Sequence, residues 1–224
     1  ESARAAWSRW RDVSAEDRAG LLVRMASIMR RRRFELSAWE VMECAKPWRE
    51  ADADVAEAID YCEFYAKRMI AMSNVQRRDV AGEENSCFYE PRGVAAIIAL
   101  WNFPLAILCG MTAAAVVTGN TAIMKPAEQS SVIAAKLMEI YAEVGLPAGV
   151  VNYLPGVGEE IGPTLAEHPD VALVAFTGSR GVGMLLNRQT AELAPGQRLR
   201  RVLPGTEEDA ERVHELLRRG SEEV

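Results

Sequence analysis

Three short polar motifs follow apolar, strand-like segments, and their side chains could bind a nucleotide and polarise a carbonyl group. In chain order they are Trp101-Asn102-Phe103-Pro104, Lys125-Pro126-Ala127-Glu128 and Phe176-Thr177-Gly178-Ser179. The Glu128 carboxylate could accept hydrogen bonds from both hydroxyls of an adenosine ribose, and the Lys125 ammonium could support the same sugar. Alternatively, Lys125 is a surface lysine and Glu128 lies near a helix N-terminus, where the macrodipole favours an acid. Taken alone, these two residues favour the alternative.

Two glycine-containing turns could face a pyrophosphate. Gly156-Val157-Gly158 follows a predicted strand and opens a helix, so its backbone N–H groups could point at phosphate oxygens. Thr177, Gly178 and Ser179 form a second such turn at the end of the strand 171–176. That strand does not end in an acid, which argues against a standard Rossmann dehydrogenase. A purely structural turn accounts for the glycines of the second turn almost as well.

Asn102 follows a predicted strand and precedes Pro104 in the middle of an apolar region. A carboxamide in such a place must find hydrogen-bond partners, and a preorganised NH2 donor is what a developing oxyanion needs. The alternative is a loop asparagine that bonds its own backbone. The order of the three motifs along the chain favours the oxyanion interpretation.

Strands and helices alternate in the second half of the chain. We expect strands near 94–99, 121–125, 150–154 and 171–176, and helices near 104–117, 130–144, 158–167 and 180–193. This alternation predicts an α/β fold with a Rossmann-like parallel sheet and flanking helices, joined by right-handed crossovers. Ligands bind beyond the carboxyl ends of the strands in such sheets, and all three motifs fall there.

The first half of the chain predicts helices that pack on this sheet. Apolar residues recur at helical spacing from Ser14 to Glu40, with Ser14 as N-cap, and again from Ala51 to Ile70. The methionines of these stripes are interpreted as core filler. A strand, a turn around Gly82 and a second strand then lead to Gly93. The methionines concerned are Met25, Met29, Met69 and Met72.

Composition and charge exclude several classes of protein. The 224 residues are 49% hydrophobic and carry a net charge of −6, which argues against nucleic-acid binding because counterion release needs a cationic surface. The four arginines 30–33 would fan around a helix, so we expect solvated side chains rather than a basic patch. The uncharged segment 93–118 raises the question of a membrane span, but Asn102 and Pro104 interrupt it.

The cysteines and histidines offer little material for a metal site, and we expect none. Reduced thiols and a cytoplasmic location are expected, because no secretory signal precedes the cysteines. His168 precedes Pro169 at a predicted helix end and is interpreted as a loop histidine. The cysteines are Cys44, Cys62, Cys87 and Cys109.

Together with the segment from Glu143 to Asn152, the three motifs resemble the aldehyde dehydrogenase superfamily. Residues 46–60, which begin Lys46-Pro47-Trp48, resemble the branch that oxidises L-glutamate γ-semialdehyde, the pyrroline-5-carboxylate dehydrogenases. Ala194-Pro195-Gly196-Gln197 resembles the same branch, although Gly181 stands where that branch commonly has a glutamate. The resemblance covers about residues 3–202.

The resemblance implies an NAD-dependent oxidation in proline catabolism. It puts Glu128 and Lys125 on the adenosine ribose, Ser179 near the pyrophosphate and Asn102 in the oxyanion hole. In the family, a cysteine thiolate attacks the aldehyde, hydride passes to the nicotinamide, and a glutamate activates the hydrolytic water. Neither that cysteine nor that glutamate can be carried over to this chain. The expected cofactor-binding residues are Trp101, Lys125, Glu128, Gly158, Thr177, Gly178 and Ser179.

The sequence thus predicts three parts. Residues 1–92 form N-terminal helices and a strand–turn–strand, residues 93–202 form an NAD-binding Rossmann-like domain, and residues 203–224 form an acidic helical tail unrelated to the family. The resemblance ends at residues 200–205, where the family would continue into a glutamate and paired glycines. The tail helix is expected from about Glu207 to Arg219.

Our leading hypothesis is the NAD-binding portion of a glutamate-semialdehyde dehydrogenase that is inactive alone. Its expected partners are NAD, an aldehyde by family, and a homo-oligomer or another chain that covers the missing catalytic half, with no nucleic acid and no membrane. One alternative is a non-catalytic assembly or capping module with the dehydrogenase fold. The other is a truncated gene product.

Overall fold

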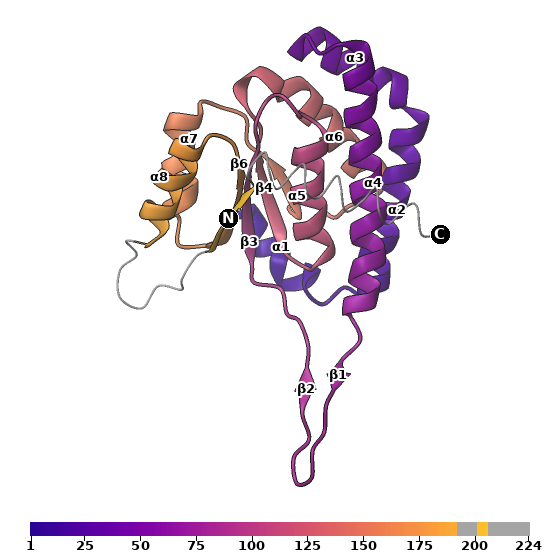
Figure 1. The fold of residues 1–224 in the computed structure, drawn as a ribbon, viewed down its shortest axis with the longest axis vertical. Helices are drawn as coiled ribbons and strands as arrows, with labels where there is room; N and C mark the ends of the chain where they lie inside the picture. The colour runs from indigo at the N-terminus through magenta and orange to yellow at the C-terminus, as the bar shows by residue number, and fades with distance from the viewer. Residues whose placement is uncertain (192–200, 206–224) are drawn as a thin grey trace.

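A parallel sheet carries the predicted motifs in the computed structural model, which describes residues 1–191 and 201–205 (Figure 1). In spatial order, the strands that the structure describes in this sheet are β5 (Val151–Tyr153), β4 (Thr121–Lys125), β3 (Val94–Ile98), β6 (Val171–Thr177) and β7 (Arg201–Gly205). All neighbouring pairs are parallel. The chain runs outward from β3 through β4 to β5, then crosses to the other side of β3. The predicted Rossmann-like α/β fold is confirmed.

Helices cover both faces of this sheet. α5 (Ala106–Val117) and α6 (Ser131–Glu143) lie on one face, and α7 (Gly158–Glu167) and α8 (Arg180–Ala191) lie on the other (Figure 1). Successive residues of β3 alternate between the two cores because side chains of a strand point to opposite faces. Ala95 and Ile97 join the core that contains α5, whereas Val94 and Ala96 join the core that contains α7 and α8.

Of the four N-terminal helices, the last three form an outer layer against α5 and α6, and the first packs directly against β3, β4 and β5. They are α1 (Ser2–Trp10), α2 (Ala15–Arg31), α3 (Arg33–Cys44) and α4 (Trp48–Met72). Ser14 caps α2 as predicted, since its hydroxyl accepts a hydrogen bond from the Asp17 N–H at 3.0 Å. Met72 is exposed, so its interpretation as core filler is wrong, whereas Met25, Met29 and Met69 are buried.

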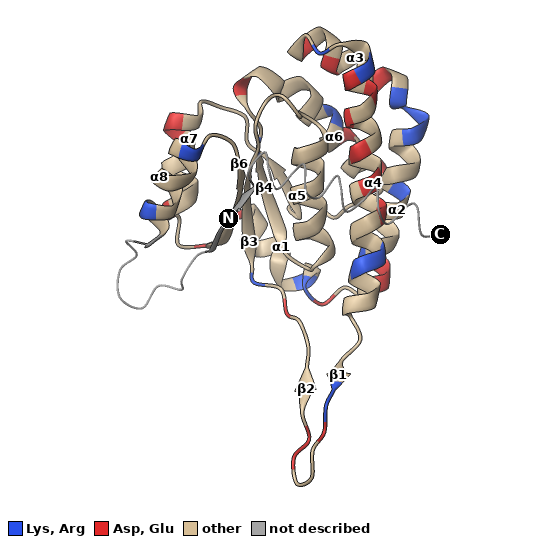
Figure 2. Ribbon diagram, viewed as in Figure 1, with Lys and Arg blue, Asp and Glu red and all other residues tan. Residues whose placement is uncertain are grey.

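The single helix expected from Ser14 to Glu40 is wrong, because α2 and α3 meet at Arg32. The arginine run 30–33 lies across this break. Each of its members ion-pairs with a different carboxylate, so the side chains are paired rather than simply solvated. The pairs are Arg30 with Glu63, Arg31 with Glu143, Arg32 with Glu35 and Glu139, and Arg33 with Asp52. Figure 2 shows that charges of both signs mix along α2, α3 and α4, while α5 carries none.

A two-stranded arm extends away from the body of the molecule (Figure 1). Its strands, β1 (Gln76–Arg77) and β2 (Ser86–Cys87), are antiparallel, and Gly82 lies in the turn with a φ of 88°. The predicted strand–turn–strand is therefore present, although its strands are short. Phe88 and Tyr89 at the base of this arm are exposed.

The C-terminal end of the sheet extends beyond the expected domain boundary at residue 203. β7 pairs with β6 from Leu173↔Arg201 to Thr177↔Gly205, so residues 203–205 belong to the sheet. The segment 194–197 and the predicted tail helix from Glu207 lie outside the described residues. No described helix combines the length and the apolar character that a membrane span requires.

Candidate functional site

The three motifs begin at the same level of the sheet. Ile98, the last residue of β3, lies beside Lys125 at the end of β4 and beside Phe176 near the end of β6. The carboxyl ends of these three neighbouring strands therefore share one edge. The direction in which strands are added reverses between β3 and β6, and ligands bind at such a reversal in open α/β sheets.

Lys125, Glu128 and Gly158 converge at this edge. The Lys125 ammonium donates a hydrogen bond to Glu128 Oε1 at 3.0 Å, and the Gly158 N–H donates to the same oxygen at 2.5 Å. The Lys125 side chain is buried, whereas the Glu128 side chain keeps 40% of its surface exposed. The structure thus brings together three residues that the sequence predicted as a site, although Glu128 and Gly158 are 30 residues apart in the chain.

The Glu128 carboxyl is held in its ionised form. Desolvation alone would raise its pKa, but hydrogen bonds from its own backbone N–H, from Lys125 and from Gly158 together lower the pKa below its usual range. Because one oxygen is engaged by Lys125 and Gly158, and the side chain remains partly exposed, the carboxylate can still accept hydrogen bonds from an incoming hydroxyl group.

Gly158 is the first residue of α7, and its lack of a side chain keeps this corner open. A Cβ atom there would lie 3.4 Å from Glu128 Oε1 and 3.4 Å from Lys125 Nζ. Glycine is more strongly required at position 156, because its φ is 152° and an added Cβ would lie 2.3 Å from the Ile161 side chain. The backbone of this turn therefore favours glycine at position 156, whereas a Cβ on Gly158 would make ordinary van der Waals contact with Glu128 and Lys125.

A carboxylate from a distant helix fixes the helix that follows Glu128. α6 begins at Ser131, as expected, but the Ser130 hydroxyl does not cap it. Instead, Glu43 of α3 accepts hydrogen bonds from the Val132 and Ile133 N–H groups at 2.6 and 2.8 Å. Glu43 was not predicted from the sequence, since nothing local marks a cap that comes from 89 residues away.

Thr177, Gly178 and Ser179 lie at the end of β6, on the other side of β3 from Lys125. Ser179 Oγ accepts a hydrogen bond from the Val182 N–H at 3.4 Å and so caps the start of α8. A Cβ on Gly178 would lie 2.7 Å from the Phe176 ring, so only glycine fits at this turn. The turn and the Lys125–Glu128–Gly158 group occupy neighbouring strand ends, and the structure gives no hydrogen bond between them within the described residues.

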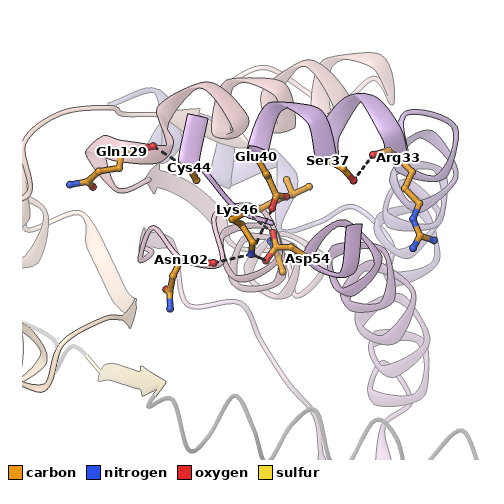
Figure 3. Close-up of polar contacts among 10 residues, drawn as sticks. Arg33, Ser37, Glu40, Cys44, Lys46, Asp54, Asn102 and Gln129 are labelled. Carbon is orange, nitrogen blue, oxygen red and sulfur yellow. Dashed lines mark hydrogen bonds and ion pairs between the residues drawn. The ribbon is translucent and has the colours of Figure 1, made fainter. Parts of the chain in front are cut away.

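Trp101 and Asn102 occupy the loop after β3. The Trp101 side chain is half-exposed, whereas Asn102 Oδ1 is buried and has no hydrogen-bond partner among the described residues. An asparagine that bonds its own backbone would satisfy this oxygen, so that alternative does not describe Asn102. Figure 3 shows the carboxamide pointing away from the side chains that hold its main chain.

The side chains of Glu40, Lys46 and Asp54 form a buried group that we call the lysine cluster, and Lys46 is the member that holds the Asn102 main chain (Figure 3). The Lys46 ammonium donates to the Asn102 main-chain oxygen at 2.9 Å. The sequence analysis placed Lys46 in a branch motif but assigned it no role. Asp54 belongs to the same motif, whereas Glu40 lies outside it and only the fold brings it to Lys46.

The four cysteines are distributed over three separate places. Cys62 and Cys109 are buried in the core with their sulfurs 3.7 Å apart, and Cys87 is exposed on the arm. The Cys44 thiol donates to the Gln129 main-chain oxygen at 3.5 Å. Burial, together with the nearby acid Glu43, raises the pKa of Cys44 to about 11, so its thiol is protonated at neutral pH and is a weak nucleophile.

The arrangement of motifs matches a known family. A family model described as "Aldehyde dehydrogenase family" matches residues 1–204. The chain belongs to the aldehyde dehydrogenase family. The resemblance inferred from the motifs is therefore confirmed for the family.

Two similar relatives are named 1-pyrroline-5-carboxylate dehydrogenases. The one from Halalkalibacterium halodurans, "1-pyrroline-5-carboxylate dehydrogenase 2", is 50% identical over 207 residues, which are 91% of this chain and 40% of the relative. The one from Geobacillus thermodenitrificans is 49% identical over 88% of this chain and 38% of its own length. The chain therefore spans about two fifths of the length of these aldehyde dehydrogenases.

Solved aldehyde dehydrogenase structures share the fold. A 1-pyrroline-5-carboxylate dehydrogenase from Thermus, described with bound NAD, superposes with a TM-score of 0.87 at 47% identity, covering 91% of this chain and 40% of that one. Proline utilization A from Bdellovibrio bacteriovorus superposes with a TM-score of 0.88 at 46% identity, covering 92% of this chain and 22% of that one. The N-terminal helices and the sheet thus form the part that this chain has in common with these proteins.

Proposed function

We propose that this chain forms the NAD-binding portion of a dehydrogenase that oxidises L-glutamate γ-semialdehyde to glutamate. The observation that carries the proposal is the convergence of Lys125, Glu128 and Gly158 on one strand end, with Glu128 ionised and partly exposed. The relatives near 50% identity are named for this reaction, and the Thermus relative is described with bound NAD.

The Lys125–Glu128–Gly158 corner has the donors and acceptors that an adenosine ribose requires. Glu128 accepts hydrogen bonds from the two ribose hydroxyls, and Lys125 keeps that carboxylate oriented while it supports the sugar. Gly158 lets the backbone approach the ligand closely. A carboxylate at the ribose repels a 2′-phosphate, so we propose NAD rather than NADP as the cofactor.

The remaining predicted residues extend the site across the sheet edge. Ser179 and the N–H groups at the start of α8 face the pyrophosphate, with Thr177 and Gly178 shaping the turn, and Trp101 borders the cofactor. Asn102 donates its NH2 group to the oxygen of the reacting aldehyde. Bound NAD supplies the hydride acceptor for this oxidation. The cysteine nucleophile and the general base lie outside this chain, so we expect no aldehyde oxidation by the chain alone.

A calorimetric titration with a charge-neutral variant tests the ribose contacts. We expect Glu128→Gln to weaken NAD binding about 10- to 100-fold, because a hydrogen bond to a charged group contributes about 1.5–3 kcal/mol. Glu139→Gln is the matched control, since Lys136 and Glu139 also form an i,i+3 ion pair, at 2.7 Å, on the exposed side of α6. Equal affinities for both variants would reject the ribose assignment.

The same titration separates the alternative roles. If the wild-type chain is folded and binds no NAD, the assembly-module interpretation replaces this proposal. Aldehyde-dependent NADH production by the purified chain, abolished in Asn102→Ala, would contradict the expected inactivity of the chain alone.

A further inference from the structure

The lysine cluster lies where α3, α4 and the loop after β3 meet. The side chains of Lys46, Glu40 and Asp54 have exposed fractions of 7%, 0% and 0%. Burying three ionisable groups is costly unless they are paired or protonated, so their retention in a core of apolar side chains requires an explanation. The contacts of Lys46 and Asp54 with the Asn102 loop supply one.

Lys46 holds the start of this loop. Its ammonium donates to the Asn102 main-chain oxygen at 2.9 Å and lies 4.7 Å from the centre of the Phe103 ring. It is also 3.5 Å from Asp54 Oδ1 and 3.8 Å from Glu40 Oε2. A single buried cation therefore connects two carboxyl groups of the helical layer to the main chain of Asn102.

Asp54 holds the end of the loop. Its Oδ2 accepts hydrogen bonds from the Leu105 and Ala106 N–H groups at 3.1 and 3.0 Å. These N–H groups open α5 and have no partner within the helix, so Asp54 caps α5 from α4. The cluster thus fixes the main chain at Asn102 and again at Leu105 and Ala106, which leaves few residues in between free to move.

Glu40 completes the cluster as a neutral acid. Burial and then the nearby negative charge of Asp54 raise the pKa of Glu40 to about 10, although Lys46 opposes this shift. At neutral pH the cluster therefore contains one cation, one carboxylate and one protonated carboxyl. The charge is balanced, and the Lys46–Asp54 pair can stay buried.

From these contacts we propose that Lys46 and Asp54 are positioning residues that fix the direction of the Asn102 carboxamide by clamping the main chain at Asn102 itself and again shortly after it, at Leu105 and Ala106. The inference rests on the proposed role of Asn102 in binding the aldehyde oxygen. A clamp on the main chain is needed because Asn102 Oδ1 has no partner of its own among the described residues. An oxyanion site requires donors held in place before the reaction.

The test observes the Asn102 side chain directly, by its NH2 resonances in 15N spectra of the chain without cofactor. Asn102→Asp identifies the signal, because it removes that pair alone. In the wild-type chain we expect one narrow pair, displaced from the positions of exposed asparagines such as Asn85. We also expect the Leu105 and Ala106 amides to exchange with solvent at least about tenfold more slowly than amides of the exposed arm.

Two variants then release the clamp in different ways. In Lys46→Met we expect the Asn102 pair to broaden and move towards the exposed-asparagine position. Asp54→Asn has nearly the same volume and keeps an acceptor for Leu105 and Ala106, so we expect about tenfold faster exchange of those amides together with a shift of the Asn102 pair. Lys136→Met is the matched control, because Lys136 also has an acidic partner and lies 5.2 Å from the centre of an aromatic ring, Trp39, away from the loop.

The Trp10 indole N–H, which donates to the Val116 main-chain oxygen at 3.0 Å, reports whether each variant keeps its core. An unchanged Asn102 pair in either folded variant would overturn the proposal. Rapid wild-type exchange of Leu105 and Ala106 would overturn it as well, and this result does not depend on a variant that folds. Because no cofactor is present, a failure of NAD binding would reject the proposed function without altering these signals.

Discussion

The molecule uses lysine with glutamate or aspartate in two different ways. At the sheet edge, Lys125 is buried but Glu128 keeps 40% of its side chain exposed, and part of the carboxylate remains available. In the lysine cluster, Lys46 and both of its acids are buried, and Lys46 and Asp54 hydrogen-bond to the main chain. Solvent exposure decides which role a carboxylate can have. An exposed carboxylate can exchange bound water for a ligand, whereas a buried one can only stabilise the protein's own main chain.

The largest effect in this comparison should follow from breaking the buried pair. Asp54→Ala leaves the Lys46 cation without its carboxylate and uncaps α5, so we expect the free energy of unfolding to fall by about 3–5 kcal/mol. Urea denaturation measures this change. Asp52→Ala is the control on the same helix, because the Arg33–Asp52 pair is partly exposed and should contribute at most about 1 kcal/mol. Similar losses for the two variants would remove the distinction between the regions.

The pH dependence of stability should come from the buried acid rather than from Glu128. Folding raises the pKa of Glu40 from 4.5 to about 10, so the folded state retains a proton that the unfolded state releases. The stability that this proton supplies is complete below the unfolded pKa and is lost as the pH rises towards the folded pKa. Between about pH 5 and pH 8, we expect the wild-type chain to lose on the order of 1–3 kcal/mol relative to Glu40→Gln.

Urea denaturation of both proteins across this pH range measures the difference. Glu128→Gln should show the opposite sign, because the folded pKa of Glu128 is lowered. Its contribution to stability is present above the unfolded pKa and is lost as the pH falls through the folded pKa. Parallel stability curves for wild type and Glu40→Gln would show that Glu40 does not retain its proton.

The smallest effect on NAD affinity should be a steric one at the open corner, which is formed by Lys125, Glu128 and Gly158. Gly158→Ala puts a methyl group 3.4 Å from both Glu128 Oε1 and Lys125 Nζ, in the path of a sugar, so we expect NAD binding to weaken about fivefold. Gly20→Ala is the control, since its Cβ meets only the end of the Arg24 side chain, at 3.5 Å within α2. It should stabilise the chain by about 0.5–1 kcal/mol with unchanged affinity. Calorimetric titration and denaturation separate the two outcomes.

The open corner could largely be predicted from the sequence, whereas the buried cluster could not. Lys125 and Glu128 lie in one short motif at the end of a strand, and Gly158 follows the neighbouring strand. Because the carboxyl ends of parallel strands share one edge of the sheet, their proximity could be predicted. Glu40 and the Asn102 main chain both reach Lys46 only because the packing of α3 and α4 against the start of α5 brings them to the same place. Hydrophobic periodicity locates helices but does not tell which polar group on one helix faces a loop 40 or more residues away.

The predicted boundaries of the N-terminal helices were wrong for a related reason. The apolar spacing from Ser14 to Glu40 is continuous and gives no signal for the break at Arg32, where the arginines pair with carboxylates of α4 and α6 that lie far away in the sequence. Glu43, which caps α6, was missed because capping rules examine only neighbouring residues. Local signals predicted the strands and the polar turns after them, and tertiary contacts decided the rest.

NAD binding at the Lys125–Glu128–Gly158 edge can be observed residue by residue. A titration of NAD into the 15N-labelled chain, followed by amide NMR, tests the location as well as the binding. We expect saturable shifts of the Lys125, Glu128 and Gly158 amides, with the Gly82 amide of the arm unchanged. Saturable shifts confined to other surfaces, or no shifts at cofactor concentrations that saturate ordinary nucleotide sites, would contradict it.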